Sequence, residues 1–267
     1  MNGHVGRTVI IKLGGSVITD KGLAFKANYR SMHRIAKELA GLTERLVVLN
    51  GAGSFGHIPV KQWGLDEGFS RKKTRPFAKT KLQLLRLQQM LVSVMAGHGL
   101  PAVPFTPSSF MIARSGRLCK AELAPIREFL DLGLVPLFGG DLVPDLDHGW
   151  AVVSADQMAS WIAPQISASM IIYGTDVDGL YDSDPKTSRD AKLIETVTLR
   201  EIRRVSRSAL SSRMPDVTAG MRGKLFEAEH AAKNGVEVVI MNLRRPENLH
   251  PILEGKTGRW TRIVPRK

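Results

Sequence analysis

The sequence predicts an α/β fold built around a parallel sheet, because segments typical of strands alternate with segments typical of helices. Several of the apolar strand segments end directly in glycine-rich turns, as strands of βα units often do. No internal repeat, low-complexity segment or Pro/Gly/Ser-rich linker divides the 267 residues. The chain is therefore predicted to form one domain, residues 1–267, with two lobes that share one continuous sheet.

The first half of the chain starts with a strand, a helix and a strand. Thr8–Leu13 (TVIIKL) and Arg45–Asn50 (RLVVLN) are short, mostly apolar runs typical of buried parallel strands, and Tyr29–Leu42 between them is predicted to be a helix. In Pro76–Gly97 the apolar residues recur at helical spacing, which predicts a second helix. Two further short strands are predicted, Ala102–Phe105 and Val135–Phe138.

The second half continues the alternation. A helix is predicted to begin near Ser154, and a strand to run from Met170 to Tyr173. Thr218–Asn234 has a helical pattern ended by Gly235. The last two predicted strands are Val236–Met241 and the tail Gly258–Val264, which is placed at an edge of the sheet. The polar sequence PDLDHG within residues 143–150 interrupts the apolar runs and marks the expected boundary between the lobes.

The bulk composition is that of an ordinary globular protein, with 43% hydrophobic and 24% charged residues. No run approaches the roughly 18 apolar residues that a membrane span needs, and the N-terminus lacks the pattern of a signal peptide. The single cysteine, Cys119, cannot form an internal disulfide. These observations predict a cytoplasmic protein.

The formal net charge is +13, and its densest part is a basic run defined by six residues: Arg71, Lys72, Lys73, Arg75, Lys79 and Lys81. The run contains Phe77 but no interleaved aromatic residues that would stack on bases. It is therefore interpreted as a solvated basic face, with attraction of an anionic substrate as the alternative. A basic nucleic-acid-binding protein stays open as an alternative, although no nucleic-acid partner is expected.

Three glycine-rich turns directly follow predicted strands: Gly14-Gly15-Ser16, Gly51-Ala52-Gly53-Ser54 and Gly174-Thr175. Glycine lets the backbone approach a ligand closely, and exposed backbone N–H groups in such turns bind anions. Lys12 closes the first strand just ahead of its turn, so its ammonium can reach a bound phosphate. Three such turns with lysines nearby predict a polyphosphate site.

Two common nucleotide-binding motifs are each matched only in part by this sequence. Residues 255–257 (GKT) match the end of a Walker A loop, but His250 stands at its first glycine. Residues 51–56 (GAGSFG) fit the dinucleotide motif, yet the expected acidic residue is replaced by the basic sequence at 70–75 (SRKKTR). A basic residue there suits a 2′-phosphate, so an NADP-dependent reductase remains an alternative.

Five segments together resemble the amino acid kinase superfamily: IIKLGGSVITDK at 10–21, NGAGSFGH at 50–57, SADQ at 154–157, GTDVDGLYDSDPK at 174–186 and DVTAGMRGK at 216–224. The resemblance covers nearly the whole chain. GAGSFGH and KLGGSVITDK are similar to the isopentenyl phosphate kinases, with the fosfomycin kinase group as a near relative. Ala155 and Ala219, where the family usually has glycine, are shared with the fosfomycin kinase pattern.

The resemblance implies an open, mainly parallel sheet sandwiched between helix layers. It also implies a phosphate-acceptor lobe at about residues 1–145 and a nucleotide lobe at about 146–267. The expected reaction is transfer of the γ-phosphoryl group of Mg-ATP to isopentenyl phosphate, giving isopentenyl diphosphate, with fosfomycin or another phosphonate as the alternative acceptor. The family also implies a homodimer.

The resemblance assigns roles to individual residues. The catalytic set comprises Lys12, His57, Asp156 and Lys224, with Asp156 orienting the two lysines and His57 bonded to the acceptor phosphate. The ATP-binding set comprises Lys12, Gly14, Gly15, Ser16, Lys21, Thr175, Asp176, Gly179, Gly220 and Lys224. The substrate-binding set comprises Gly51, Ala52, Gly53, Ser54, Gly56, His57 and Gly140.

No protein metal site is expected, because Mg²⁺ is held mainly by phosphates. Four residues of the second predicted helix are candidates for an isoprenoid pocket: Leu84, Leu87, Met90 and Leu91.

Overall fold

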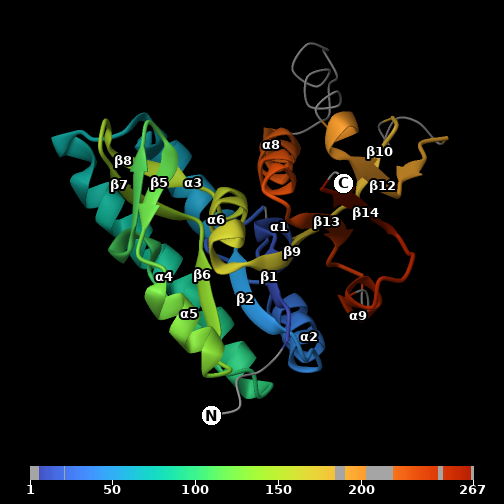
Figure 1. Ribbon diagram of the computed structural model, residues 1–267. Coiled ribbons are helices and arrows are strands. Elements are labelled where there is room, and N and C mark those ends of the chain that lie inside the picture. Colours follow the sequence, from blue (N-terminus) through green and yellow to red (C-terminus); the bar gives the residue numbers. More distant parts are fainter. Residues whose placement is uncertain (1–5, 21, 184–189, 203–218, 246–248, 266–267) are drawn as a thin grey trace.

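A computed structural model describes residues 6–20, 22–183, 190–202, 219–245 and 249–265. Its main sheet has eight strands in the order β12-β14-β13-β9-β1-β2-β6-β3. The bounds of these strands are β1 Thr8–Leu13, β2 Arg45–Asn50, β3 Ala102–Pro104, β6 Val135–Gly139, β9 Ala168–Thr175, β12 Thr196–Thr198, β13 Glu237–Asn242 and β14 Trp260–Val264. Every neighbouring pair is parallel except β13 with β14. The predicted mainly parallel α/β sheet is confirmed (Figure 1).

Helices cover both faces of this sheet. Their bounds are α1 Gly15–Ile18, α2 Tyr29–Ala40, α3 Gly53–Trp63, α4 Thr74–Gly97, α5 Ala124–Asp131, α6 Ala155–Ile162, α8 Ala219–Lys233 and α9 Leu249–Leu253. Apolar residues of α2, α4 and α9 pack on one face, and those of α5, α6 and α8 pack on the other. The predicted arrangement of a sheet between two helix layers is therefore confirmed.

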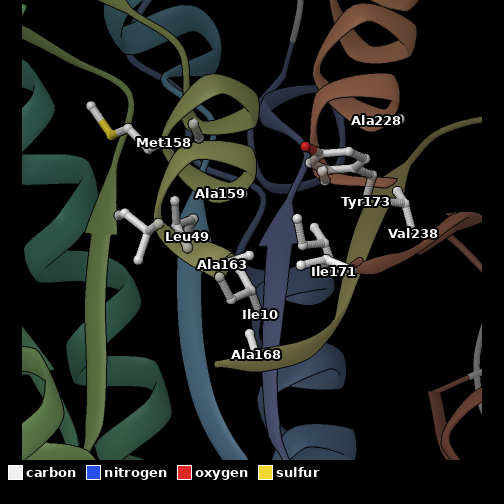
Figure 2. Close-up of a cluster of buried hydrophobic side chains, with 14 of the residues drawn as sticks. Ile10, Leu49, Met158, Ala159, Ala163, Ala168, Ile171, Tyr173, Ala228 and Val238 are labelled. Carbon is white, nitrogen blue, oxygen red and sulfur yellow. The ribbon is translucent and has the colours of Figure 1, made fainter. Parts of the chain in front are cut away.

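Alternation along β1 explains how one strand serves both layers. Successive side chains of a strand point to opposite faces, so Ile10 belongs to the α5–α6–α8 side and Ile11 to the α2–α4–α9 side. Figure 2 shows the cluster on the α5–α6–α8 side, where Ile10 and Ile171 of neighbouring strands lie below the helix layer and the ring of Tyr173 lies below α8 with its hydroxyl directed toward α6. Such strands read as continuous apolar runs because both of their faces are buried.

A second sheet of four strands, in the order β5-β4-β7-β8, was not predicted from the sequence. Its strands are β4 Met111–Arg114, β5 Arg117–Ala121, β7 Asp141–Asp145 and β8 Gly149–Val153. The PDLDHG sequence is the turn of the β7–β8 hairpin, where Asp145 accepts hydrogen bonds from the backbone N–H groups of Asp147 and His148, each at 2.9 Å. The expected lobe boundary falls inside this hairpin, and the division into lobes at residue 145 stays a prediction.

The position predicted for the C-terminal strand was wrong in one respect. Residues 260–264 form β14, as expected, but β14 lies between β13 and β12 rather than at the edge. The edge is occupied by the short strand β12, which pairs in parallel with β14. Three alternating residues gave too weak a pattern for β12 to be predicted. No helix in the described part of the chain is long and apolar enough to cross a membrane.

Candidate active site

Four turns meet at one edge of the main sheet. Leu13, the last residue of β1, lies opposite Asn50 of β2 on one side and Gly174 of β9 on the other. Asn50 in turn lies opposite Gly139 at the end of β6. Ligands of open α/β sheets bind beyond the carboxyl ends of the strands, so this register brings the three predicted glycine turns and the Gly139-Gly140 turn to a common site.

The glycines of these turns are required because their backbones touch. A Cβ atom on Gly15 would lie 2.5 Å from the Gly53 nitrogen, and one on Gly51 would lie 2.6 Å from the Gly15 nitrogen. Gly14 packs equally tightly on the Gly174 carbonyl, which accepts its N–H at 2.8 Å. Gly53 also has a positive φ of 49°, which favours glycine. The turns therefore form one continuous backbone wall.

A cavity of about 660 Å³ opens over this wall, which is within the range of small-molecule sites. Most of the predicted site residues line it, namely Lys12, Gly14, Gly15, Ser16, Gly51, Ala52, Gly53, Ser54, Gly56, His57, Gly140, Asp156, Thr175, Asp176 and Lys224. Gly220 lies in the first turn of α8, and Lys21 lies outside the described residues. Gly179 is not part of the lining, because it packs against Thr261, whose Oγ1 would lie 2.3 Å from an added Cβ.

The centre of the site is an ion triad formed by Lys12, Asp156 and Lys224. Lys12 comes from β1, Asp156 from the first turn of α6 and Lys224 from α8. Each lysine Nζ lies 2.9 Å from a different carboxylate oxygen of Asp156. The carboxylate thus holds two buried ammonium groups side by side, which without it would repel each other.

Burial and the neighbouring charges shift the pKa values of Asp156 and Lys224 in the triad. Burial alone would raise the pKa of Asp156, but the two lysines outweigh it and hold the pKa well below its usual range. Burial, followed by the positive charge of Lys12, lowers the pKa of Lys224 to about 8, although Asp156 opposes this shift. The carboxylate is therefore ionised at neutral pH, and Lys224 is close to its titration point.

This pKa predicts a loss of activity at basic pH. The sequence resemblance assigns Lys224 to the ATP phosphates. The value of kcat/KM for ATP reports ionisations of the free enzyme, and we expect it to fall as the pH rises through about 8, because neutral Lys224 would attract phosphates less strongly. The measurement is a pH profile between pH 6 and pH 10, each limit about two units from that value. In Lys224→Arg the guanidinium stays protonated over this whole range, so the decrease of kcat/KM above pH 8 should disappear. If the decrease is unchanged in this variant, it is caused by the ionisation of another group.

His57 lies on α3 at the mouth of the cavity. Although the ring is solvent-accessible, the surrounding protein removes much of its hydration, and with the charges of Lys12 and Lys61 this lowers its pKa. The charged imidazolium form of His57 is therefore disfavoured at neutral pH in the free protein. Neutral His57 can still donate a hydrogen bond to an anion.

Three residues that the sequence did not single out belong to the surroundings of the triad, and one of them, Tyr173, contacts it directly. Tyr173 of β9 donates its hydroxyl to the Asp156 carbonyl at 3.0 Å, and Lys224 Nζ lies 4.8 Å from the centre of its ring. Glu227, one turn after Lys224, is buried in the cavity wall and forms a bidentate ion pair with Arg117 of β5. The i,i+3 spacing of Lys224 and Glu227 in a predicted helix was the available signal.

The other end of the cavity has an apolar wall. It is formed by α3, α4 and the β7–β8 hairpin, through Ile58, Val60, Leu84, Leu142 and Val152. Of the four candidates for an isoprenoid pocket, Leu84 lines this wall. Leu87 and Leu91 are buried in the core between α4 and the main sheet, and the partly buried Met90 packs against that core, so none of these three lines the cavity.

The acidic TDVDG turn is a structural feature around Asp178. This buried carboxylate accepts hydrogen bonds from Asn242 at 2.9 Å and from Arg259 at 2.9 and 3.0 Å, and pairs with Arg245. It therefore joins β9 to β13 and β14. In the described ranges, no group of three or more His, Cys, Asp or Glu side chains is placed to hold a metal ion.

A model of the amino acid kinase family matches residues 7–242. The chain belongs to the amino acid kinase family. The isopentenyl phosphate kinase of Methanothermobacter thermautotrophicus is 35% identical over 265 residues, which cover 96% of this chain and 98% of that protein.

Solved structures of this family agree with that relationship. A structure of an isopentenyl phosphate kinase superposes with a TM-score of 0.83 at 32% identity, covering 96% of this chain and 100% of the other. The product complex of the T. acidophilum isopentenyl phosphate kinase gives a TM-score of 0.78 at 26% identity, covering 96% and 99% of the two chains. Membership of the amino acid kinase family implies ATP as the phosphoryl donor, as the sequence resemblance predicted.

Proposed function

We propose that this chain is an isopentenyl phosphate kinase, which transfers the γ-phosphoryl group of ATP to isopentenyl phosphate and forms isopentenyl diphosphate. The observation that carries the proposal is the Lys12–Asp156–Lys224 triad, which lies between a glycine-rich backbone wall and an apolar pocket. The names of the related kinases support the same acceptor.

The nucleotide is placed on the side of Thr175, Asp176 and α8. The backbone wall is formed by glycines whose Cβ atoms would be blocked, so it leaves N–H groups and space for phosphates. Lys224 supplies positive charge from α8. Because the described residues contain no cluster of metal ligands, Mg²⁺ is expected to arrive with ATP and to neutralise phosphate charge.

The acceptor is placed on the side of His57 and the apolar wall. The phosphate group of isopentenyl phosphate would lie against residues 51–56 and accept a hydrogen bond from neutral His57. The hydrocarbon tail would lie against Leu84 and Leu142, where burial of apolar surface is favourable.

The geometry suits phosphoryl transfer without a covalent intermediate. Lys12 comes from β1, which lies in the sheet between β2 on the acceptor side and β9 on the nucleotide side. Its ammonium can stabilise the charge on the transferring phosphoryl group, and Asp156 holds it in place. Positioning and electrostatic stabilisation account for most of the catalysis in such reactions.

The direct test is ADP release with Mg-ATP and a panel of acceptors: isopentenyl phosphate, dimethylallyl phosphate, fosfomycin, acetylglutamate and buffer alone. Saturable turnover with the isoprenoid phosphates that is lost in His57→Ala would support the proposal. Because neutral His57 acts as a donor, His57→Gln should retain more activity than His57→Ala. If only fosfomycin stimulates ADP release, the acceptor is fosfomycin and not isopentenyl phosphate. If neither fosfomycin nor an isoprenoid phosphate stimulates ADP release, the proposal is overturned.

Leu84 gives a prediction about the length of the acceptor. Leu84→Phe should raise KM for longer isoprenoid phosphates more than for isopentenyl phosphate, because the larger ring fills the apolar end of the cavity. The matched control is Leu82→Phe, since Leu82 is exposed on the same helix. The measurement is kcat/KM for five-, ten- and fifteen-carbon phosphates; unchanged selectivity would place the tail elsewhere.

The homodimer and the cytoplasmic location expected from the sequence remain predictions. The first is measured by sedimentation or light scattering of the purified chain, and the second by fractionation of the source cells.

A further inference from the structure

A second buried ion pair borders the acceptor end of the cavity. Lys81 of α4 is the last residue of the basic run, and its side chain is only 16% exposed. Its Nζ donates to both carboxylate oxygens of Asp141 and, at 2.8 Å, to Ser108 Oγ. The interpretation of the basic run as a solvated face is therefore wrong for Lys81, although Lys79 on the same helix is exposed.

Asp141 is the centre of a small network. Its side chain is 4% exposed, and it accepts the backbone N–H groups of Ser108 at 3.1 Å and Leu142 at 2.8 Å. The carboxylate thus joins α4, the short 3-10 helix Pro107–Ser109 and the first residue of β7. These contacts fix the residue that directly follows Gly140.

The network lies beside the predicted acceptor site. Asp141 and its neighbour Gly140 both line the main cavity, together with His57 and Leu84. Gly140 donates its N–H to the Asn50 carbonyl at 3.0 Å, so this turn is held against the end of β2. Lys81 lines only a small adjoining hollow that it shares with Asp141 and Gly140, and therefore does not itself face the acceptor.

The charge of Asp141 matters because the proposed acceptor is an anion. A carboxylate in the cavity wall would repel a phosphate group through a medium that screens charge poorly. Lys81 neutralises that charge through a direct ion pair with Asp141, and it does so from the adjoining hollow, outside the main cavity. We propose that Lys81 is a positioning residue for the phosphate acceptor, which makes the Asp141 turn electrically neutral and holds Gly140 in the cavity wall.

This inference rests on the proposed function, because it assumes a phosphate acceptor on that side. Its test compares four variants: Lys81→Met, Asp141→Asn, the double variant Lys81→Met/Asp141→Asn, and the control Lys79→Met. For each, KM for ATP and for isopentenyl phosphate is measured. The Kd for isopentenyl phosphate is measured by calorimetry with a non-hydrolysable ATP analogue saturating the nucleotide site, and thermal unfolding shows whether the variant is folded.

Lys81→Met is expected to raise KM and Kd for isopentenyl phosphate by about tenfold or more, because it leaves an unpaired buried carboxylate. KM for ATP should change by less than about twofold. The double variant removes the carboxylate charge as well and should recover most of the lost affinity. A purely structural pair would differ from this expectation in Asp141→Asn, which breaks the same contact and would then weaken acceptor binding. Asp141→Asn retains the lysine charge and should bind the acceptor at least as tightly as the unmodified chain. Lys79→Met should have no effect.

Two results would overturn the inference: an unchanged KM for the acceptor in folded Lys81→Met, or a double variant as weak as the single one. If Lys81→Met does not fold, weaker acceptor binding by Asp141→Asn than by the unmodified chain would also overturn it. Failure of the proposed function is distinguishable, because the unmodified chain would then neither bind nor phosphorylate isopentenyl phosphate. In that case the same variants, titrated with inorganic phosphate beside the ATP analogue, test the charge effect alone, and equal affinities would overturn it.

Discussion

Replacement of Lys12 by methionine is expected to lower kcat by roughly 10²–10³-fold, the usual effect of removing one preorganised charge from such a site. Lys12 lies at the end of β1, buried and 2.9 Å from Asp156, and its charge is felt by both His57 and Lys224. Methionine keeps most of the volume of the side chain and removes the ammonium, so the loss should appear in kcat more than in KM for ATP.

The measurement is steady-state kinetics with both substrates varied, together with thermal unfolding. Lys37→Met is a suitable control, because Lys37 is an exposed lysine of α2. A folded Lys12→Met variant that retains more than about a tenth of the unmodified kcat would contradict the role given to Lys12, since the expected loss is at least ten times larger.

Replacement of Asp156 by asparagine is expected to damage both stability and catalysis. The substitution leaves the ammonium groups of Lys12 and Lys224 close together in a buried site with no compensating charge. Removal of one partner of a buried ion pair destabilises proteins by about 3–5 kcal/mol. We also expect kcat to fall by at least about 10²-fold, because neither lysine is then held toward the phosphates.

The effect on stability should depend on pH with a definite sign. The pKa of Asp156 is depressed in the folded protein, so its contribution is fully present above the unfolded value of about 3.9 and is lost as the pH falls through the folded pKa. The measurement is urea unfolding of Asp156→Asn and the unmodified chain at pH 7 and at progressively lower pH. A difference in unfolding free energy that is absent at pH 7 would refute the proposed contribution of the carboxylate. As a control, Asp147→Asn alters an exposed acid of the β7–β8 turn and should change little.

Lys12 and Asp156 were identified as site residues from different kinds of sequence information. Lys12 was identifiable directly, because a lysine that ends a buried apolar strand before a Gly-Gly turn has few structural explanations. Asp156 was assigned through the family resemblance alone, since an acidic residue in the first turn of a helix is also common for electrostatic reasons. The structure brings it within 2.9 Å of both lysines, which come from positions 12 and 224.

The sequence was sufficient to predict the α/β class, the parallel strands and the glycine turns, because these depend on local patterns: apolar runs of strand length, helical spacing and residues that must lack a Cβ. It also indicated Lys12, His57 and Leu84. Which distant groups meet could not be predicted in this way. The Arg117–Glu227 and Lys81–Asp141 pairs, the position of β14 and the burial of Leu87 and Leu91 depend on how the helices and the second sheet pack, and local spacing carries no information about that packing. The ionisation of Lys224 and His57 was decided in the same way, because burial and neighbouring charges exist only in the folded chain.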